Sequence, residues 1–193
     1  MASDAPVTLG IDPGLGCTGF AVLDPKGRLI HHSTFRSTTR DGTETQRGAA
    51  IAARARSLAD LHGCTVAGLE WQHSIPGRGN SMLKLAGLRG AIATTLTLAG
   101  VEVLEVQPTE AKKRLTGTGN ADKQQMQAAV LQRYGAEVAQ DVADAVGMAE
   151  HAQRTARLRA MQPELIAERR RWAPASGAGA YAAPRGRELR QAT

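Results

Sequence analysis

The sequence is poor in aromatic residues, which make up 3% of its 193 positions, and it contains only two cysteines, Cys17 and Cys64. The scarcity of aromatic side chains argues against a large stacking platform for single-stranded nucleic acid. The two cysteines show neither a disulfide framework nor a zinc-ligand spacing. We therefore expect two reduced thiols packed within the fold.

Long apolar runs are also missing. Nothing approaches the roughly 18 consecutive apolar residues that a membrane helix needs. The first ten residues, MASDAPVTLG, lack the basic and then apolar pattern of a secretory signal peptide. These absences predict a cytoplasmic protein with no membrane partner. The length suits one α/β domain with a proper core, followed by a tail.

The charge is unevenly distributed along the chain. Residues 1–150 carry 5 Lys and 10 Arg against 15 Asp and Glu, whereas residues 151–193 carry 9 Arg and 3 Glu and hold the whole net charge of +6. We expect a folded domain over residues 1–160 and a basic, partly disordered tail rich in Arg, Ala, Gly and Pro over residues 161–193. Such a tail fits a polyanion, most simply nucleic acid, and equally fits an ordinary solvated appendage.

The pattern of apolar residues predicts an α/β fold. Three alternating stretches joined by short turns indicate an antiparallel meander, and the later apolar runs and helical periodicities indicate buried strands between helices. In chain order we expect strands at 7–12, 17–24 and 28–37, a helix at 43–63, a strand at 64–70, a helix at 81–100, a strand at 101–108, and helices at 122–135 and from 140. The β-β-β-α-β-α-β-α-α order predicts a mixed five-stranded sheet, antiparallel in strands 1–3 and parallel in strands 4 and 5, with helices on both faces.

Four acidic residues stand at places where the predicted elements could bring them together. Asp12 ends the first strand inside the glycine-rich stretch GIDPGLGCTG, which alone could cradle a phosphate, hold a metal or turn a hairpin. Glu70 ends the fourth strand, so parallel neighbouring strands would place both carboxylates at one edge of the sheet. Asp141 and Asp144 share one face at the start of the last helix. That pair also suits simple capping and dipole stabilisation of the helix.

Four carboxylates at one point would repel one another unless cations neutralised them. A site with oxygen ligands only suits Mg²⁺ or Mn²⁺ rather than zinc. Two such ions, about 4 Å apart, can activate a water and stabilise the leaving oxygen of a phosphodiester. The glycines beside Asp12 would let a nucleic-acid backbone approach closely. The acids thus favour a metal-dependent hydrolysis of phosphodiesters.

Five stretches, taken together and in order over residues 7–151, resemble the RuvC family of Holliday-junction resolvases. They are GIDPGLGCTGFAVL, LEWQ, KLAGLRGA, AKKRLTGTGNADKQQMQ and DVADAVGMAEH. The resemblance implies an RNase H-like fold, a homodimer, and a crossover junction endodeoxyribonuclease. Such an enzyme makes Mg²⁺-dependent paired symmetric nicks in four-way DNA junctions during recombination and repair. It also implies a possible partnership with a branch-migration motor complex.

The resemblance also implies roles for particular residues. Asp12, Glu70, Asp141 and Asp144 match the family's four catalytic acids, which implies that they bind two Mg²⁺ ions, with Mn²⁺ able to substitute. Lys112 and Lys123 match basic positions near the DNA backbone, and Lys113 could share that role. Neutralising phosphates in this way would make binding weaken with salt. Lys123 also suits an exposed lysine in the first turn of a helix.

The loop after Glu70 departs from the family pattern. Better-known members have an aromatic residue three positions after the second acid, where this chain has His73, with Trp71 two positions earlier. Trp71, His73 and the loop residue Arg78 are therefore candidate DNA contacts, although Trp71 also suits the core. The family match at this loop therefore assigns neither the residue that opens the junction centre nor a preferred cleavage sequence.

Apolar residues also form a stripe along the helix at 81–100, namely Met82, Leu85, Leu88, Ile92 and Leu96. The stripe fits either a dimer interface, as the resemblance implies, or ordinary packing on the sheet.

Three other functions also fit parts of this sequence. A RuvC-like nuclease could have broader specificity for branched DNA or RNA, and a silent junction-binding module would leave the four acids unexplained. An ATP-binding protein of the actin and sugar-kinase kind shares an Asp-x-Gly loop on its opening strand, but that superfamily needs two such domains and a longer chain.

Overall fold

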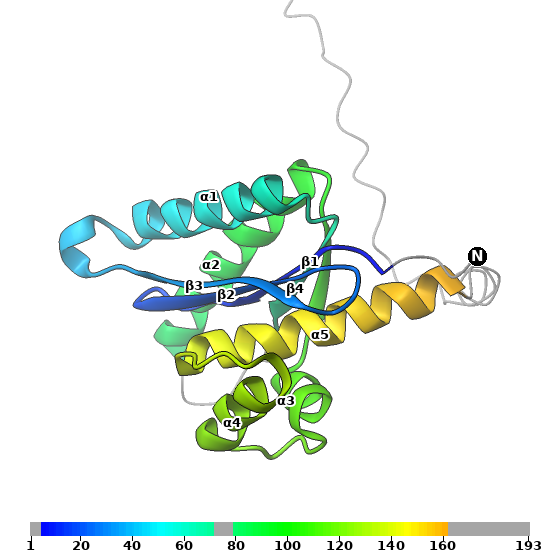
Figure 1. The fold of residues 1–193 in the computed structure, drawn as a ribbon. Helices are drawn as coiled ribbons and strands as arrows, with labels where there is room; N and C mark the ends of the chain where they lie inside the picture. The colour runs from blue at the N-terminus through cyan, green and yellow to red at the C-terminus, as the bar shows by residue number, and fades with distance from the viewer. Residues whose placement is uncertain (1–4, 72–78, 162–193) are drawn as a thin grey trace, which may run out of the picture. The chain divides into compact units, whose positions relative to one another are not determined.

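The computed structural model describes residues 5–71 and 79–161. Within them, the chain forms a five-stranded sheet in the order β3-β2-β1-β4-β5 (Figure 1). Its strands are β1 (Thr8–Asp12), β2 (Cys17–Leu23), β3 (Leu29–Arg36), β4 (Val66–Glu70) and β5 (Glu102–Val106). The first three pair antiparallel, β4 pairs parallel with β1, and β5 pairs parallel with β4. The predicted mixed five-stranded α/β fold is confirmed.

Helices cover both faces of this sheet (Figure 1). One face packs against α1 (Glu44–His62) and α2 (Gly79–Leu98), and the other against α5 (Gln140–Met161), with α3 (Pro108–Thr116) and α4 (Lys123–Tyr134) beyond it. A short 3₁₀ helix, η1 (Thr39–Asp41), precedes α1. Helix α1 begins with a capping box between Thr43 and Gln46 and ends at Gly63 in the left-handed region, as its sequence signals predict.

The number of helices after β5 differs from the sequence-based order, which had two where the structure has three. The additional helix is α3, which begins at Pro108 and ends at Gly117 with a φ of 87°. Proline ends a strand because it lacks an N–H, but the same property and its fixed φ suit the first position of a helix. Pro108 therefore both stops β5 and starts α3.

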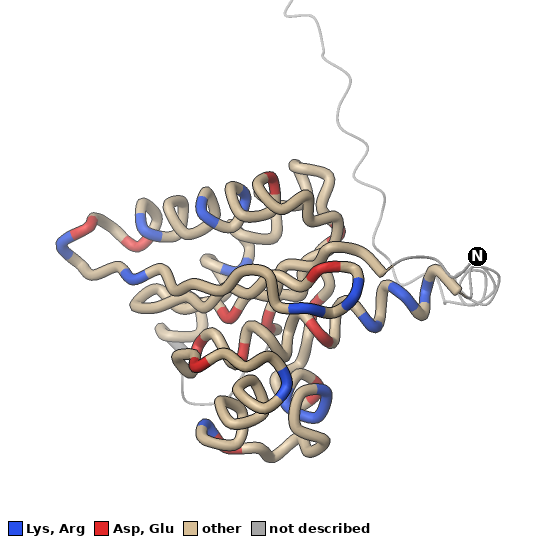
Figure 2. The backbone as a smooth tube through the Cα atoms, in the orientation of Figure 1, with Lys and Arg blue, Asp and Glu red and all other residues tan. Residues whose placement is uncertain are grey.

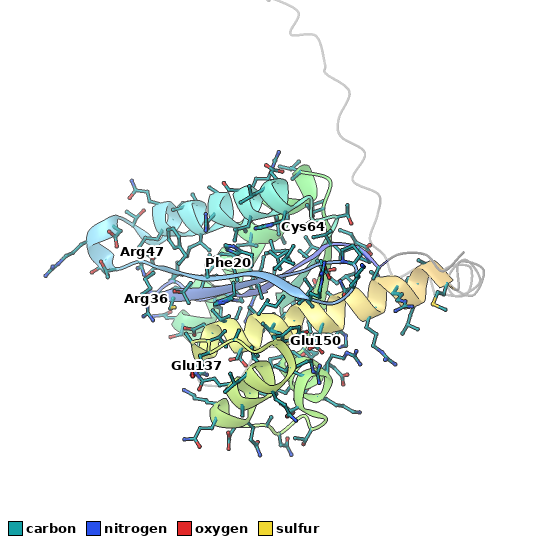
Figure 3. All side chains as sticks on the ribbon, viewed as in Figure 1. Phe20, Arg36, Arg47, Cys64, Glu137 and Glu150 are labelled. Carbon is teal, nitrogen blue, oxygen red and sulfur yellow. The ribbon has the colours of Figure 1, made fainter. Side chains whose placement is uncertain are left out.

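Charge runs along α5 from acidic to basic. Asp141, Asp144 and Glu150 come first, and the arginines of this helix follow in its last turns (Figure 2). Glu150 lies on the opposite side of the sheet from Arg47 of α1 (Figure 3). The acidic beginning of α5 is therefore separated along the helix from its basic end.

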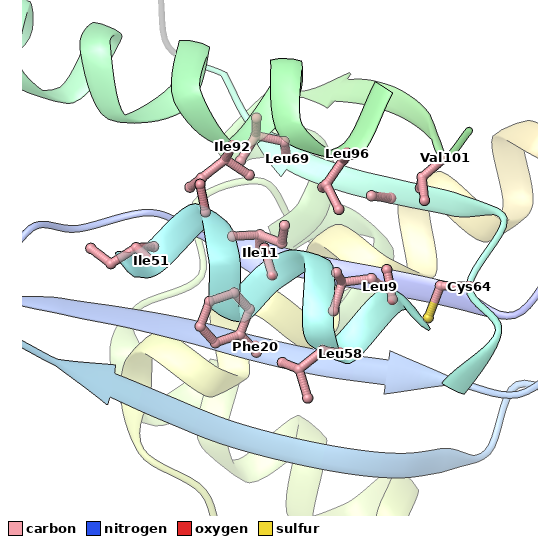
Figure 4. Packing of buried hydrophobic residues seen from close by; sticks show 14 of the residues in the cluster. Leu9, Ile11, Phe20, Ile51, Leu58, Cys64, Leu69, Ile92, Leu96 and Val101 are labelled. Carbon is pink, nitrogen blue, oxygen red and sulfur yellow. The ribbon is translucent and has the colours of Figure 1, made fainter. Parts of the chain in front are cut away.

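Alternation along the central strands sorts side chains to the two faces. Leu9, Ile11, Phe20 and Leu69 are buried against α1 and α2 (Figure 4). Leu88, Ile92 and Leu96 of α2 enter the same core, so these three members of the apolar stripe pack on the sheet. Met82 and Leu85 are only half-buried. The packing interpretation holds for the buried part of the stripe.

Glycines on the other face let α5 lie directly on the strands. A Cβ atom added to Gly10 would stand 1.9 Å from the carbonyl oxygen of Ala145, and one added to Gly68 would stand 2.4 Å from that of Met148. A Cβ on Gly19 would stand 1.9 Å from the carbonyl oxygen of Asp141. These contacts involve backbone atoms, which cannot rotate away. The three glycines, one each from β1, β2 and β4, therefore form a floor on which the backbone of α5 rests.

Other expectations have mixed outcomes. Cys17 is half-buried and Cys64 buried, and both are free thiols, as expected. No helix within the described parts of the chain combines the length and hydropathy of a membrane span. The basic tail, with Arg169–Arg171, lies outside the described residues, and the boundary between domain and tail stays a prediction.

Replacing Gly10 by alanine tests the glycine floor. We expect Gly10→Ala to destabilise the fold by about 3 kcal/mol or more, because overpacking against backbone cannot be relieved by a rotamer change. Urea unfolding followed by circular dichroism measures this. Gly87→Ala in α2 is the matched control, since a Cβ there meets nothing within 4 Å. It should gain up to about 1 kcal/mol of helix stability. A Gly10→Ala protein as stable as the unmodified chain would contradict the close approach.

Candidate active site

Asp12 and Glu70 lie side by side at one edge of the sheet. Asp12 is the last residue of β1 and Glu70 the last of β4, and the parallel register pairs Ile11 with Leu69 immediately before them. Each acid follows a floor glycine, Gly10 or Gly68, by two residues, so its side chain leaves the sheet on the face that α5 covers. The expectation that these two strand ends are parallel neighbours is confirmed.

The first turns of α5 bring Asp141 and Asp144 to the same place. The backbone of Asp141 rests on Gly19, and Gly19 is the antiparallel partner of Asp12. The two aspartates stand three residues apart, on one face of the helix. The floor contact therefore sets the start of α5 over the strand end that carries Asp12.

The pKa values show that the four acids interact. Burial, the hydrogen bond with Glu70 and the negative charges of Glu70, Asp144 and Asp141 together raise the pKa of Asp12 well above its ordinary value. Burial also raises the pKa of Asp144; Lys112 opposes this, while Glu70 and Asp141 add to it. Carboxyl groups whose pKa is raised by burial and by neighbouring carboxylates, as for Asp12 and Asp144, are a common feature of catalytic sites.

Protein partners engage the four carboxylates in the structure. Asp12 and Glu70 share a hydrogen bond, Asp144 is hydrogen-bonded with Gln140, and Asp141 is hydrogen-bonded with Cys17. Burial, followed by this bond to Asp141, raises the pKa of Cys17 to about 11. Among residues 5–71 and 79–161, no group of three or more His, Cys, Asp or Glu side chains is arranged so that it could hold a metal ion.

The donor set nevertheless fits a hard divalent cation. All four acids offer oxygen ligands only, which suits Mg²⁺ or Mn²⁺. Their mutual repulsion, visible in the raised pKa of Asp12, is what a bound cation would relieve. A cation would compete with the present hydrogen bonds for the same carboxylate oxygens.

The predicted DNA-contacting lysines differ in how exposed they are. Lys112 of α3 is half-buried, and its charge opposes the rise in the pKa of Asp144 that burial causes. Lys113 is exposed and lines a cavity with Thr118, and Lys123 is exposed as the first residue of α4, after its cap Asp122. The charge of Lys112 therefore acts on Asp144 in the structure.

The segment after Glu70 is described only at its start. Trp71 is half-buried, and its backbone N–H donates to the carbonyl of Val106. His73 and Arg78 lie outside the described residues, so their proposed DNA contacts stay predictions.

Sequence reasoning missed two side chains at this site. Cys17, at the start of β2, bonds Asp141, and Arg89 of α2 forms an ion pair with Glu70, at 3.7 Å between Nη2 and Oε1. A signal for Arg89 was present, because it follows Leu85 by four residues and precedes Ile92 by three, which places a charge within the apolar stripe.

Comparison with known proteins decides the family. The family model described as "Crossover junction endodeoxyribonuclease RuvC" matches residues 8–151. The chain belongs to the RuvC family. RuvC nucleases are hydrolases and are metal-dependent.

Individual relatives agree with this assignment. The RuvC of Hyphomonas neptunium is 39% identical over 147 residues, which cover 73% of this chain and 86% of that protein. The RuvC of Zymomonas mobilis is 34% identical over 151 residues, covering 74% and 87%. The structure of Thermus thermophilus RuvC in complex with a Holliday junction substrate matches with a TM-score of 0.70 at 26% identity, over 79% of this chain and 96% of that one. The expected RNase H-like fold is confirmed.

The raised pKa of Asp12 predicts how stability depends on pH. Between the ordinary Asp pKa of about 3.9 and the raised value, the folded chain binds this proton more tightly than the unfolded chain, so stability falls as pH rises through that window. We expect Asp12→Asn to melt at a higher temperature than the unmodified protein at pH 8 in EDTA. The difference should shrink toward pH 4.

Asp24→Asn is a control for these melting experiments, because its melting temperature should change in the opposite direction. The backbone N–H of Arg28, with further hydrogen bonds from Arg28 and Lys26, lowers the pKa of Asp24. Its ionised form therefore stabilises the fold above the ordinary Asp pKa, and Asp24→Asn should melt lower at pH 8. An Asp12→Asn protein that also melts lower at pH 8 would argue against repulsion among the four acids.

Proposed function

We propose that this chain resolves four-way DNA junctions by paired symmetric nicks, as a metal-dependent endodeoxyribonuclease of recombination and repair. The observation that carries the proposal is a group of four interacting acids in a RuvC-family chain, with Asp12 and Glu70 at the carboxyl ends of two parallel strands and Asp141 and Asp144 on α5. The T. thermophilus relative, solved with a Holliday junction substrate, supports branched DNA as the ligand.

The four acids would hold two Mg²⁺ ions, for which Mn²⁺ can substitute. Ions so bound supply an activated water and stabilise the leaving oxygen of the scissile phosphodiester. Asp12 and Asp144 must lose their protons to act as ligands, and their raised pKa values make that step pH-dependent. Lys112, beside Asp144, offers a positive charge next to the place where a phosphate would bind.

The DNA would be held mainly through its backbone. Lys112 and Lys123 would neutralise phosphates, with Lys113 as a neighbour. Trp71 begins the segment that follows Glu70, and His73 and Arg78 within that segment are the remaining candidates for contact near the junction centre.

Two symmetric nicks need two active sites, which a homodimer supplies. Leu83 and Leu98 of α2 are 72% and 83% exposed, and their position supports α2 as part of the dimer surface. A branch-migration motor complex is a further proposed partner. Residues 1–160 would form the nuclease domain, and residues 161–193 a basic tail. Access to DNA favours the cytoplasm as the place of action.

Substrate specificity can be tested directly. The chain should be incubated with Mg²⁺ and four matched substrates: a four-way junction, a flap, a linear duplex and an RNA. We expect symmetric nicks confined to the junction, with ends that ligase can seal. Comparable cleavage of flaps or RNA would instead favour a RuvC-like nuclease of broader specificity.

Asp12→Asn separates cleavage from binding. The amide keeps the size of the side chain but weakens its hold on a cation, so cleavage should fall by at least about 100-fold, since bound metal supplies several kcal/mol to the transition state. Junction affinity, measured by fluorescence anisotropy in EDTA, should stay close to that of the unmodified chain. Cleavage at a normal rate would show that the acids were wrongly assigned, and lost binding would point to misfolding, which the melts above detect.

Lys123→Ala tests the phosphate contact. We expect weaker junction binding at all sequences and a plot of log affinity against log salt that is shallower by about 0.9. Lys26→Ala is the matched control, because Lys26 is an exposed lysine in the turn between β2 and β3. A slope for Lys123→Ala equal to that of Lys26→Ala would assign Lys123 to the exposed helix surface.

A further inference from the structure

The positively charged side chain of Arg89 lies within the protein interior, beside the proposed catalytic acids. The side chain of Arg89 is 4% exposed, and that of its neighbour Glu70 is 12% exposed. Arg89 Nη2 stands 3.7 Å from Glu70 Oε1, which is close enough for an ion pair but longer than a hydrogen bond. Among the described residues, neither Nε nor Nη2 of Arg89 has a hydrogen-bond partner.

Buried donors without partners are costly, and arginine cannot escape the cost by losing its proton. Arg47 of α1 shows how this chain satisfies a buried guanidinium elsewhere. Its Nε donates to Ser37 Oγ at 3.0 Å, and its Nη2 donates to the carbonyls of Leu15 at 2.7 Å and Ser37 at 3.2 Å. Arg47 therefore stabilises the fold through local hydrogen bonds, whereas Arg89 has two donors next to an acid that find no partner in the described part of the chain.

Arg89 reaches Glu70 from behind the site. Arg89 belongs to α2, which packs on the face of the sheet opposite to α5, whereas Asp141 and Asp144 belong to α5. Glu70 has two oxygens, and Oε1 is the one that faces the guanidinium. A carboxylate held at one oxygen by an outer partner is left with the other to offer to a cation.

We propose that Arg89 is a positioning residue, which holds Oε1 of Glu70 so that this carboxylate is oriented toward a divalent cation shared with Asp12. This inference rests on the proposed function, because it assumes that Glu70 is a metal ligand. The planar guanidinium suits the role, since its donors Nε and Nη2, which have no hydrogen-bond partner among the described residues, form a fixed fork that lysine lacks. Its charge also offsets part of the repulsion among the four acids.

Manganese binding in the absence of DNA tests the proposal without relying on cleavage. Titration calorimetry of the full chain with Mn²⁺ should show binding weaker by about 10- to 100-fold for Arg89→Met, the loss typical of removing an outer partner of a metal ligand. Arg89→Lys keeps the charge but lacks the fork, so its Mn²⁺ affinity should lie between that of the unmodified chain and that of Arg89→Met. Arg47→Met is the matched control, a second buried arginine, and should melt lower while binding Mn²⁺ as the unmodified chain does.

The outcomes separate this inference from the function on which it rests. If Asp12→Asn binds Mn²⁺ normally, the metal site itself is wrongly placed and both proposals fall. If Asp12→Asn binds weakly and folded Arg89→Met binds normally, the positioning role alone is overturned. Loss of junction affinity in EDTA by Arg89→Met would assign Arg89 to DNA and also overturn it. Should Arg89→Met fail to fold, Arg89→Lys decides, because unmodified Mn²⁺ affinity in that variant contradicts a need for the fork.

Discussion

The close approach of α5 to the sheet is the constraint on which the rest of the structure depends. Gly10, Gly19 and Gly68 leave no side chain between the strands and the helix, so backbone meets backbone in three neighbouring strands. Gly10 precedes Asp12 by two residues, Gly68 precedes Glu70 by two residues, and Gly19 is the antiparallel partner of Asp12, so the glycines and these acids lie on the same face of the sheet. A helix standing one side chain further out would carry Asp141 and Asp144 away from both strand ends.

This close packing gathers negative charge, and the structure balances it with cations from two directions. Lys112 acts on Asp144 from the side of α3, and Arg89 pairs with Glu70 from the side of α2. Neither cation removes the repulsion, since the pKa of Asp12 is still raised. Charge that the protein leaves uncompensated favours divalent cations, so the same imbalance that costs stability favours metal binding.

Much of this could be predicted from sequence, for physical reasons that also set the limit. Asp12 and Glu70 each end a strand whose apolar residues predict burial. When two such strands are parallel neighbours, their carboxyl ends lie at the same edge of the sheet. Arg89 was missed because its neighbours Leu85 and Ile92 dominate the periodicity of the helix, which hides one charge inside the stripe. The floor glycines could not be recognised, because a glycine in a strand reveals close approach only once the partner helix is known. Helix α3 was missed because Pro108 was interpreted only as the end of β5.

The buried carboxylate of Glu150 helps to keep Lys112 beside the acids. Glu150 accepts hydrogen bonds from Arg133 Nη1, at 2.6 Å to each oxygen, and from the Tyr134 hydroxyl at 2.8 Å, which ties α4 to α5. Arg133 Nη2 also donates to the carbonyl of Leu115 at the end of α3. A Cβ on Gly147 would stand 3.0 Å from the carbonyl of Ala111, so α3 lies close against α5 one residue before Lys112. The helices that carry the proposed DNA-binding lysines are thus fixed to the helix that carries two of the acids. The proposed substrate binding and metal binding would therefore both depend on the position of α5, and a change that shifts this helix would disturb both together.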